Sequence, residues 1–316
     1  MNSVVLPSNS NRVLILGNGF DLDLGWNTKF SDYVKSKYWP KNAPPGSILS
    51  YLESCRNIAD WFDLELEIGK FFSGSATRGD SKYVQEFNQK YFLKLVDGFK
   101  QYLIEATKEP VRQDSIAAIV LSAIMDNSNF SSIYSFNYTS LNDIANRLSL
   151  YASFNYEHVH GSIQNDDIII GAPEDVDLNP GYEFLYKTFN EHYTSNSLIH
   201  DLRDAREVVF FGHSLGPTDY HYFREFFREQ CREGLSRQET KKITIFTYDN
   251  ASRLAILSQL RKMNEKRTNL LYNQNDFKII ITSNGMNTDV RAFLNHLDQT
   301  GSYKSAGVLP NLAVSF

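Results

Sequence analysis

The feature that most constrains how this chain can fold is an alternation of short apolar runs with segments of helical spacing. Short runs of β-branched and aromatic residues predict buried strands, and strands separated by helices are typical of a parallel, doubly wound sheet. The pattern predicts strands at 13–16, 132–136, 156–159, 168–170, 208–211, 243–246 and 277–281, and helices at 141–150, 220–233, 251–262 and 288–297. We therefore expect an α/β fold with a Rossmann-like, mostly parallel sheet.

Two longer helical stripes lie between the first two predicted strands. Apolar residues fall at helical spacing over 48–66 and again over 84–102, with a break rich in glycine and serine at 73–77. Another helix is predicted around 115–125. Together they predict an all-helical insertion, about 45–127, in a single domain that spans residues 1–316. The final residues, 301–316, could pack on that domain, reach a partner subunit of a homo-oligomer or be mobile.

Charge and cysteine content exclude several kinds of partner and site. The 32 basic and 37 acidic residues give a net charge of -5, which is no general reason to expect a duplex nucleic acid. Cys55 and Cys231 can build neither a disulfide framework nor a four-thiolate zinc site, which indicates a reducing compartment. No apolar stretch is long enough to span a bilayer. We expect a cytoplasmic protein without a membrane partner.

A glycine turn follows the first predicted strand. Gly17, Asn18 and Gly19 come directly after the apolar run and lead to Asp21. Ligands of open α/β sheets bind beyond the carboxyl ends of the strands, and glycines there let the backbone approach a pyrophosphate beside the amides of a following helix. An ordinary tight turn explains such a sequence equally well. The dinucleotide fingerprint is also incomplete, because Gly25 comes six residues after Gly19 instead of three.

Polar residues follow the predicted strand at 132–136. Asn137 and Thr139 lie at the expected ligand edge, just before the helix that starts near Leu141. Either side chain could cap that helix, and we assign the cap to Thr139. Asn137 is then free to contact a ligand.

Two histidines end the next predicted strand. Strand alternation places His158 and His160 on one face, and Gly161 lets a substrate come close to the backbone. A single histidine at a strand end is more often structural than catalytic. The pair also allows a metal site, but no third ligand is evident nearby, and we expect no metal.

The motif after the strand at 208–211 has the pattern of a nucleophile elbow. Gly212, Ser214 and Gly216 form a Gly-x-Ser-x-Gly sequence after a strand, as in α/β-hydrolases. Residues for a triad with Ser214 follow in the hydrolase order, namely Asp249, Asp276 or Asp289 and then His296.

Two features argue against the hydrolase interpretation. An elbow serine sits at the start of its helix, whereas Gly216 and Pro217 favour a later start, with Thr218 or Asp219 as the cap. A hydrolase also leaves the glycine turn and the Asn137 motif unexplained.

As an ordered set, Gly-Asn-Gly-Phe-Asp, Phe-Asn-Tyr-Thr, Val-His-Gly and Gly-His-Ser-Leu resemble the motifs of the bacteriophage abortive infection AbiH family. The resemblance runs from Val13 to about Asp219 and includes Trp61 and Glu65 in the first insertion helix. AbiH-like proteins in turn resemble the sirtuin superfamily, whose motifs bind NAD and supply a catalytic histidine. A sirtuin-like fold is therefore implied.

The resemblance also implies roles for individual residues. His160 would be the acid/base, and Asn137 would hold nicotinamide, its ribose or the attacking water. The residues that would bind the rest of NAD are Gly17, Asn18, Gly19 and Asp21 at the phosphates, Gly25 in the loop over the nicotinamide ribose, Gly212 and Ser214 at the phosphates or adenosine ribose, and Tyr248 or Asp249 beside the adenine.

Departures from the sirtuin pattern redirect the implied activity. Phe136 and Thr139 replace the sirtuin glutamine and aspartate, and the zinc-binding cysteine quartet is missing. Protein deacetylation is therefore not expected. The resemblance implies instead hydrolysis of NAD to ADP-ribose and nicotinamide during phage infection, with a phage-derived trigger or partner protein as one option.

Other activities remain open on the sequence. A non-catalytic sensor of NAD or ADP-ribose would use the same glycine turn, and a serine hydrolase would use Ser214. A nuclease lacks a carboxylate cluster spaced for two metal ions. Trp61 and Glu65 share a helix face, for which a buried Trp with a structural Glu is the more frequent explanation and a catalytic Glu65 the alternative.

Overall fold

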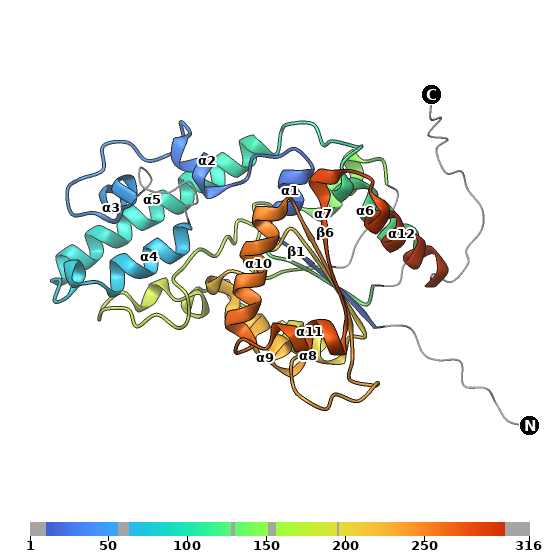
Figure 1. Ribbon diagram of the computed structural model, residues 1–316. Helices are drawn as coiled ribbons and strands as arrows, with labels where there is room; N and C mark the ends of the chain where they lie inside the picture. The colour runs from blue at the N-terminus through green and yellow to red at the C-terminus, as the bar shows by residue number, and fades with distance from the viewer. Residues whose placement is uncertain (1–10, 56–62, 128–129, 151–155, 195, 301–316) are drawn as a thin grey trace, which may run out of the picture.

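The computed structural model describes residues 11–55, 63–127, 130–150, 156–194 and 196–300, and within them the centre of the molecule is a six-stranded sheet (Figure 1). Its strands are β1 (Arg12–Leu16), β2 (Ser132–Ser135), β3 (Glu157–His158), β4 (Glu207–Phe211), β5 (Lys242–Thr247) and β6 (Asp276–Ile281). All neighbouring strands in this part of the chain pair in parallel, in the order β3-β2-β1-β4-β5-β6. The predicted α/β, Rossmann-like architecture is confirmed.

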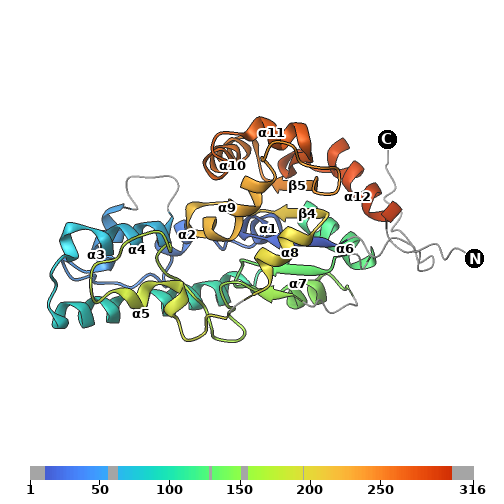
Figure 2. The same cartoon turned by 90° about the horizontal axis from the view of Figure 1, so that it is seen from below.

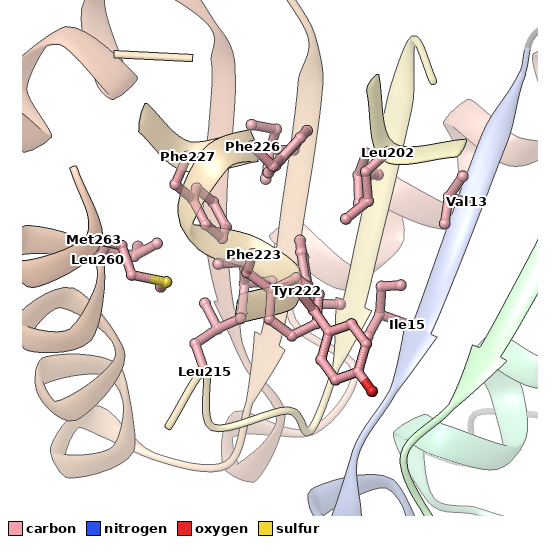
Figure 3. Close-up of a cluster of buried hydrophobic side chains, with 14 of the residues drawn as sticks. Val13, Ile15, Leu202, Leu215, Tyr222, Phe223, Phe226, Phe227, Leu260 and Met263 are labelled. Atoms are coloured by element: carbon pink, nitrogen blue, oxygen red, sulfur yellow. The ribbon is translucent and has the colours of Figure 1, made fainter. Parts of the chain in front are cut away.

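Four helices cover one face of the sheet (Figure 2). They are α8 (Leu198–Asp204), α9 (Tyr220–Glu229), α10 (Asn250–Met263) and α11 (Thr268–Gln274). Val13 and Ile15 of β1 point to this face, where Phe223 and Phe227 of α9 and Leu260 of α10 complete the core (Figure 3). Each large apolar side chain buried in this way contributes about 1.5–3 kcal/mol.

Helices on the opposite face explain why the strands are apolar on both sides. These helices are α1 (Asn18–Asp23), α6 (Ile116–Asn127), α7 (Leu141–Arg147) and α12 (Thr288–Thr300). Leu14 and Leu16 of β1 point into this second core. Asp23 fixes α6 there, because its Oδ2 accepts a hydrogen bond of 2.7 Å from the Ala117 amide. The helix predicted around 115–125 therefore packs on the sheet, whereas we expected it to complete the helical insertion.

The remaining helices form a separate lobe beside the sheet, at the left of Figure 1. The helical lobe consists of α2 (Phe30–Lys35), α3 (Ile48–Cys55), α4 (Leu64–Ser73), the 3₁₀ turn η1 (Ser75–Thr77) and α5 (Lys82–Ala106). Leu49, Phe72 and Phe99 belong to its core, which is distinct from the two cores of the sheet. No described helix combines the length and the apolar character that a membrane span needs.

Several predicted elements have different bounds in the structure. A helix begins at Asn18, within the glycine turn, whereas helical patterning was expected only from about Thr28. The single helix predicted over 48–66 is two helices, since α3 ends at Cys55 and α4 begins at Leu64. Asp63 caps α4, because its Oδ1 accepts a hydrogen bond of 3.0 Å from the Leu66 amide.

The strand predicted at 168–170 is wrong. These residues have no strand partner, and Ile168 and Ile170 instead bury their side chains in the core of the helical lobe. They lead into a segment, residues 171–194, that we call the strap. Apart from the 3₁₀ turns η2 (Glu183–Leu185) and η3 (Lys187–Phe189), the strap contains neither helix nor strand, and it connects the lobe to the sheet.

Candidate functional site

The four sequence motifs meet at one edge of the sheet. They follow β1, β2, β3 and β4, which are neighbours in the sheet and all run in the same direction. The carboxyl ends of parallel strands share an edge, so residues far apart in the sequence come together there. The strand order also reverses direction between β1 and β4, and that switch point is where ligands of open α/β sheets bind.

Glycines let the loops after β1 and β4 touch through their backbones. A Cβ atom on Gly19 would lie 2.6 Å from Gly212 Cα, and one on Gly17 would lie 2.5 Å from His213 Cα. Gly212 has a φ of +68°, and a Cβ there would lie 2.3 Å from the Phe20 nitrogen. Only glycine fits at such an approach. The close contact of the two loops is therefore a physical reason for the glycine pattern.

Some backbone amides of the glycine turn already donate hydrogen bonds within the protein. The Gly19 amide donates a hydrogen bond of 2.9 Å to Gly212 O, and the Phe20 amide donates one of 2.8 Å to Gly17 O. Asn18 is exposed, and its Oδ1 accepts a hydrogen bond from Thr28 Oγ1. Gly25 has a φ of +98° and belongs to the turn that ends α1. These contacts give the turn a structural role in the state described.

A buried carboxyl group joins the first two motifs. Asp21 is 1% exposed; its Oδ1 accepts a hydrogen bond of 2.8 Å from Asn137 Nδ2, and its Oδ2 accepts one of 2.9 Å from Thr139 Oγ1. Burial raises the pKa of Asp21 to about 7, although both hydrogen bonds oppose the shift. Asn137 is thus held by Asp21 and is not free, and its buried Oδ1 has no hydrogen-bond partner within the described residues.

The predicted cap at Thr139 is wrong by one residue. Ser140 is the N-cap of α7, and its Oγ accepts a hydrogen bond of 3.1 Å from the Asp143 amide. The Thr139 hydroxyl is turned to Asp21 instead. As a cap, a hydroxyl oxygen accepts from a backbone amide, whereas the Thr139 hydroxyl donates to the buried carboxyl group of Asp21, and Ser140 supplies the cap.

Next to this contact lies a buried cluster of charged groups and imidazoles, the Asp219 cluster, made of Glu65, His160, Lys187, His213 and Asp219. Asp219 is at the centre, with Oδ1 3.4 Å from His160 Nε2 and Oδ2 3.4 Å from His213 Nε2. The Leu215 amide donates a hydrogen bond of 3.0 Å to His213 Nδ1, so the proton of neutral His213 is on Nε2, towards Asp219.

Lys187 enters the same cluster from the strap. Its Nζ lies 2.9 Å from Glu65 Oε2, 3.3 Å from His160 Nε2 and 3.7 Å from Asp219 Oδ1. Glu65 comes from the helical lobe, whereas Asp219 ends the 3₁₀ turn η4 (Pro217–Asp219) beyond β4. The cluster is therefore assembled from the lobe, the strap and the sheet edge.

An aromatic ring supports both imidazoles. The Phe136 ring lies edge-on to His213 and His160, with centroid distances of 4.5 and 5.2 Å. Tyr222 of α9 packs on the other side, 5.4 Å from Phe136. Such edge-to-face contacts fix ring orientation as well as excluding water. Phe136 thus has a packing role.

Burial and charge drive the pKa values in the cluster apart. Burial, strengthened by the charge of Lys187, lowers the pKa of His160 to about 3, which keeps this imidazole neutral at pH 7. Burial raises the pKa of Glu65 to about 7 against the charge of Lys187. Burial opposes ionisation of Asp219 too, but Lys187 and the imidazoles outweigh it, and the net pKa of Asp219 falls well below its usual range.

The serine hydrolase triad is not assembled. Ser214 is exposed just beyond the carboxyl end of β4, whereas His296 Nε2 lies 2.9 Å from Glu207 Oε2 at the amino end of that strand. A strand of this length separates its ends by roughly 16 Å, too far for a hydrogen-bonded pair. The start of α9 at Tyr220, later than an elbow allows, confirms the objection from the sequence.

Other predicted site residues lie away from the cluster. Tyr248 is 64% exposed after β5, and Asp249 caps α10, where its Oδ1 accepts a hydrogen bond of 2.8 Å from the Ser252 amide. His158 is at the end of β3, with Nδ1 2.9 Å from Asn137 O. Trp61 lies outside the described residues.

Sequence reasoning missed Lys187 and His213 and gave Asp219 only the role of a helix cap. Asp219 is the N-cap residue of α9, as expected, although its side chain makes no cap hydrogen bond among the described residues. The carboxylate points instead to two imidazoles from separate loops. Lys187 carried no signal, because it belongs to no predicted helix, strand or motif.

A small pocket opens beside the cluster. Its volume is about 150 Å³. The lining residues are Glu174, Asp175, Pro217, Tyr220, His221 and Arg224. Pro217 and Tyr220 lie on either side of Asp219 in the chain. Burial lowers the pKa of His221, and the charge of Asp219 opposes this shift. Among the described residues, no group of three or more His, Cys, Asp or Glu side chains is placed to hold a metal ion.

Comparison with known proteins identifies the family. The family model described as "Bacteriophage abortive infection AbiH" matches residues 13–236, which include all four motifs and every member of the Asp219 cluster. Neither a curated protein nor a solved structure matches the chain at a significant level. The match covers well over half of the sequence, and the chain belongs to the bacteriophage abortive infection AbiH family.

Proposed function

We propose that this abortive infection protein hydrolyses NAD at the bond between nicotinamide and ribose, and that the Asp219 cluster is the reactive centre. One observation carries the proposal. At the switch point of the sheet, burial raises the pKa of Glu65 to about 7, while its surroundings lower the pKa of Asp219. Two carboxyl groups with pKa values driven in opposite directions are typical of an acid/base pair at work near neutral pH.

The reaction suits such a pair. Breaking the glycosidic C–N bond leaves both electrons on nicotinamide and a positive charge on the ribosyl carbon. The ionised Asp219 carboxylate stabilises that charge inside a site of low polarity. Water then forms the new C–O bond, and its proton passes to ionised Glu65 and on to solvent. The products are nicotinamide, ADP-ribose and one proton.

His160 and Asn137 keep the assignments made from the sequence, with roles refined by their contacts. His160 is a neutral imidazole beside Asp219, and it can accept a proton once Lys187 no longer occupies its Nε2. Asn137 offers an unpaired Oδ1 and is held in place by Asp21. An amide oxygen of this kind can accept a hydrogen bond from the nicotinamide amide or a ribose hydroxyl.

We propose the remaining NAD contacts from the positions of the residues in the fold. Gly17, Asn18, Gly19, Gly25, Gly212 and Ser214 surround the switch point, and the strand order is that of dinucleotide-binding folds. The pocket of about 150 Å³ is smaller than the 300–1,000 Å³ usual for small-molecule sites. Binding of a dinucleotide therefore requires the loops at this edge to open, which includes the loop that carries Glu174 and Asp175.

The test is NAD loss and nicotinamide release by purified protein. Asp219→Asn should lower turnover by about 10²–10³-fold, the usual effect of losing one electrostatic stabiliser. His160→Ala and Asn137→Ala should lower it as well. His200→Ala and Asp204→Asn are the matched controls, because their side chains are exposed and belong to α8, which precedes the amino end of β4, whereas the motifs follow the carboxyl ends of the strands.

Two results would sink the assignment. One is turnover undiminished in folded Asp219→Asn and His160→Ala, and the other is absence of turnover in the wild type even with phage lysate present. The second result would favour a nucleotide sensor. Calorimetry with NAD and ADP-ribose would then give binding without product.

A further inference from the structure

Lys187 fills the centre of the proposed reaction site. Its side chain is 2% exposed, and its Nζ contacts Glu65, His160 and Asp219, at 2.9, 3.3 and 3.7 Å. The proposed reaction gives each of these three groups a task, and each is held by the same ammonium. The position between two carboxylates is also where a positively charged sugar would be stabilised.

Two positive charges cannot share that position. The attraction between buried carboxylates and one cation is strong because the surroundings are poorly polarisable, and a second cation meets the same strength of repulsion. Burial opposes ionisation of Lys187, but Glu65 and Asp219 more than compensate, and the net pKa of Lys187 is raised. The lysine thus stays charged in this state, and a cationic ribosyl centre is excluded while it remains.

The helical lobe holds Lys187 in place through the strap. Asn179 Nδ2 donates hydrogen bonds of 2.8 Å to both Gly74 O and Thr77 Oγ1 of the lobe. Gln85 Nε2 of α5 donates one of 3.1 Å to Pro180 O. These contacts fix the strap within ten residues of Lys187, on the side of the lobe.

The strap then folds back on its own first residues just before Lys187. The Ala172 amide donates a hydrogen bond of 2.9 Å to Leu185 O, and a Cβ on Gly171 would lie 2.3 Å from the same oxygen. The Gly171 amide also donates to Glu65 Oε1, at 3.4 Å. Tyr182 and Leu185 of the strap are buried in the core of the helical lobe, so displacement of this part of the lobe would carry Lys187 with it.

We propose that Lys187 is an internal plug: it keeps the site inactive by occupying the place of the cationic sugar, and the strap must withdraw it before NAD can react. This inference rests on the proposed function. It assigns the helical lobe the task of receiving the activating signal, because the lobe anchors the strap. An enzyme that destroys NAD needs such a restraint in an uninfected cell.

The experiment compares turnover in the wild type with two variants that release the plug in different ways. Lys187→Gln removes the charge but keeps a hydrogen-bond donor for Glu65, and Asn179→Ala weakens the anchor without touching the site. Without a trigger, we expect Asn179→Ala to turn NAD over at least about fivefold faster than the wild type, because the loss of its two hydrogen bonds to the lobe shifts the closed equilibrium. Lys187→Gln should be faster by at least about tenfold.

Controls and a second measurement keep the plug separate from the hydrolase assignment. Asn273→Ala changes an exposed asparagine of α11 and should match the wild type. Hydrogen exchange of the strap amides and calorimetry with ADP-ribose need no turnover: both release variants should exchange faster in the strap, and Lys187→Gln should bind ADP-ribose more tightly than the wild type. Circular dichroism verifies that each variant is folded.

The outcomes are distinct. Faster turnover in both release variants supports the plug and the hydrolase together. If no variant consumes NAD but strap exchange and ADP-ribose affinity rise, the plug stands and the hydrolase fails. Folded Lys187→Gln with turnover, affinity and strap exchange all at or below the wild type would overturn the plug, and would make Lys187 a group that the active state needs.

Discussion

Asp21 should make the protein less stable as the pH rises from about 4 to about 7. Its carboxyl group is 1% exposed, and burial raises its pKa from 3.8 to about 7. Between these values the folded protein holds a proton that the unfolded chain has released, so each pH unit lowers the free energy of unfolding by about 1.4 kcal/mol. Over the whole window the loss is about 4 kcal/mol. Below and above it, both states carry the same charge and the contribution is constant.

Asp21→Asn isolates this effect because it keeps the shape and the hydrogen bonds. The new carbonyl can accept from Asn137 Nδ2, and the new amide can donate to Thr139 Oγ1, whose hydroxyl is then free to rotate. The amide does not ionise. At pH 8 the variant should therefore be more stable than the wild type by up to about 4 kcal/mol, and the difference should shrink towards zero near pH 4.

Urea denaturation followed by circular dichroism at several pH values between 4 and 8 measures the difference. Titration of the other acidic groups, Glu65 included, contributes equally to both proteins and cancels. Asp204→Asn, at an exposed site, should follow the wild type at every pH. A constant difference between Asp21→Asn and the wild type across this range, or a less stable variant at pH 8, would refute the reasoning.

Three further outcomes follow from the geometry. Gly212→Ala should cost about 3 kcal/mol or more in thermal unfolding, because φ is +68° and the added Cβ would lie 2.3 Å from the Phe20 nitrogen; Gly234→Ala, also at positive φ but with open space, should cost only about 1 kcal/mol. Glu207→Ala should destabilise by about 3–5 kcal/mol because it removes the buried carboxylate that lies 2.8 Å from Arg12 and also contacts His296, whereas Glu225→Ala breaks only an exposed pair and should cost under about 1 kcal/mol in urea. The wild type should not be labelled by a fluorophosphonate, because the described residues assemble no triad with Ser214 at its side of the sheet; specific labelling of Ser214 would contradict this.

The sheet could be predicted because each strand carries its signal locally. The run from Val13 to Leu16 is apolar on every residue, since helices cover both faces of β1, and β4 reads the same way for the same reason. Ile168 and Ile170 have a similar sequence but pack on the helical lobe. A short apolar run shows that a segment is buried, not what buries it.

The site was predictable only where it follows a strand. Asn137 and His160 lie just beyond strand ends, so the strand pattern alone predicted them at one edge, whereas His213, in the loop after β4, was not singled out. Lys187 reaches the same place through a segment without regular structure, and nothing in its neighbours marks it. Asp219 has the sequence context of a helix cap, and only the folded chain shows that two imidazoles claim its carboxylate instead.

The origin of the Asp219 cluster from three parts of the fold restricts how relatives of this chain can be recombined. Glu65 belongs to the helical lobe, Lys187 to the strap and Asp219 to the sheet edge. A chimaera that takes its lobe from one homologue and its sheet from another would therefore join halves of a charge network that were never matched. If the lobe and the strap are exchanged together, the hydrogen bonds between them are kept. The contacts of Lys187 with His160 and Asp219 then have to be restored.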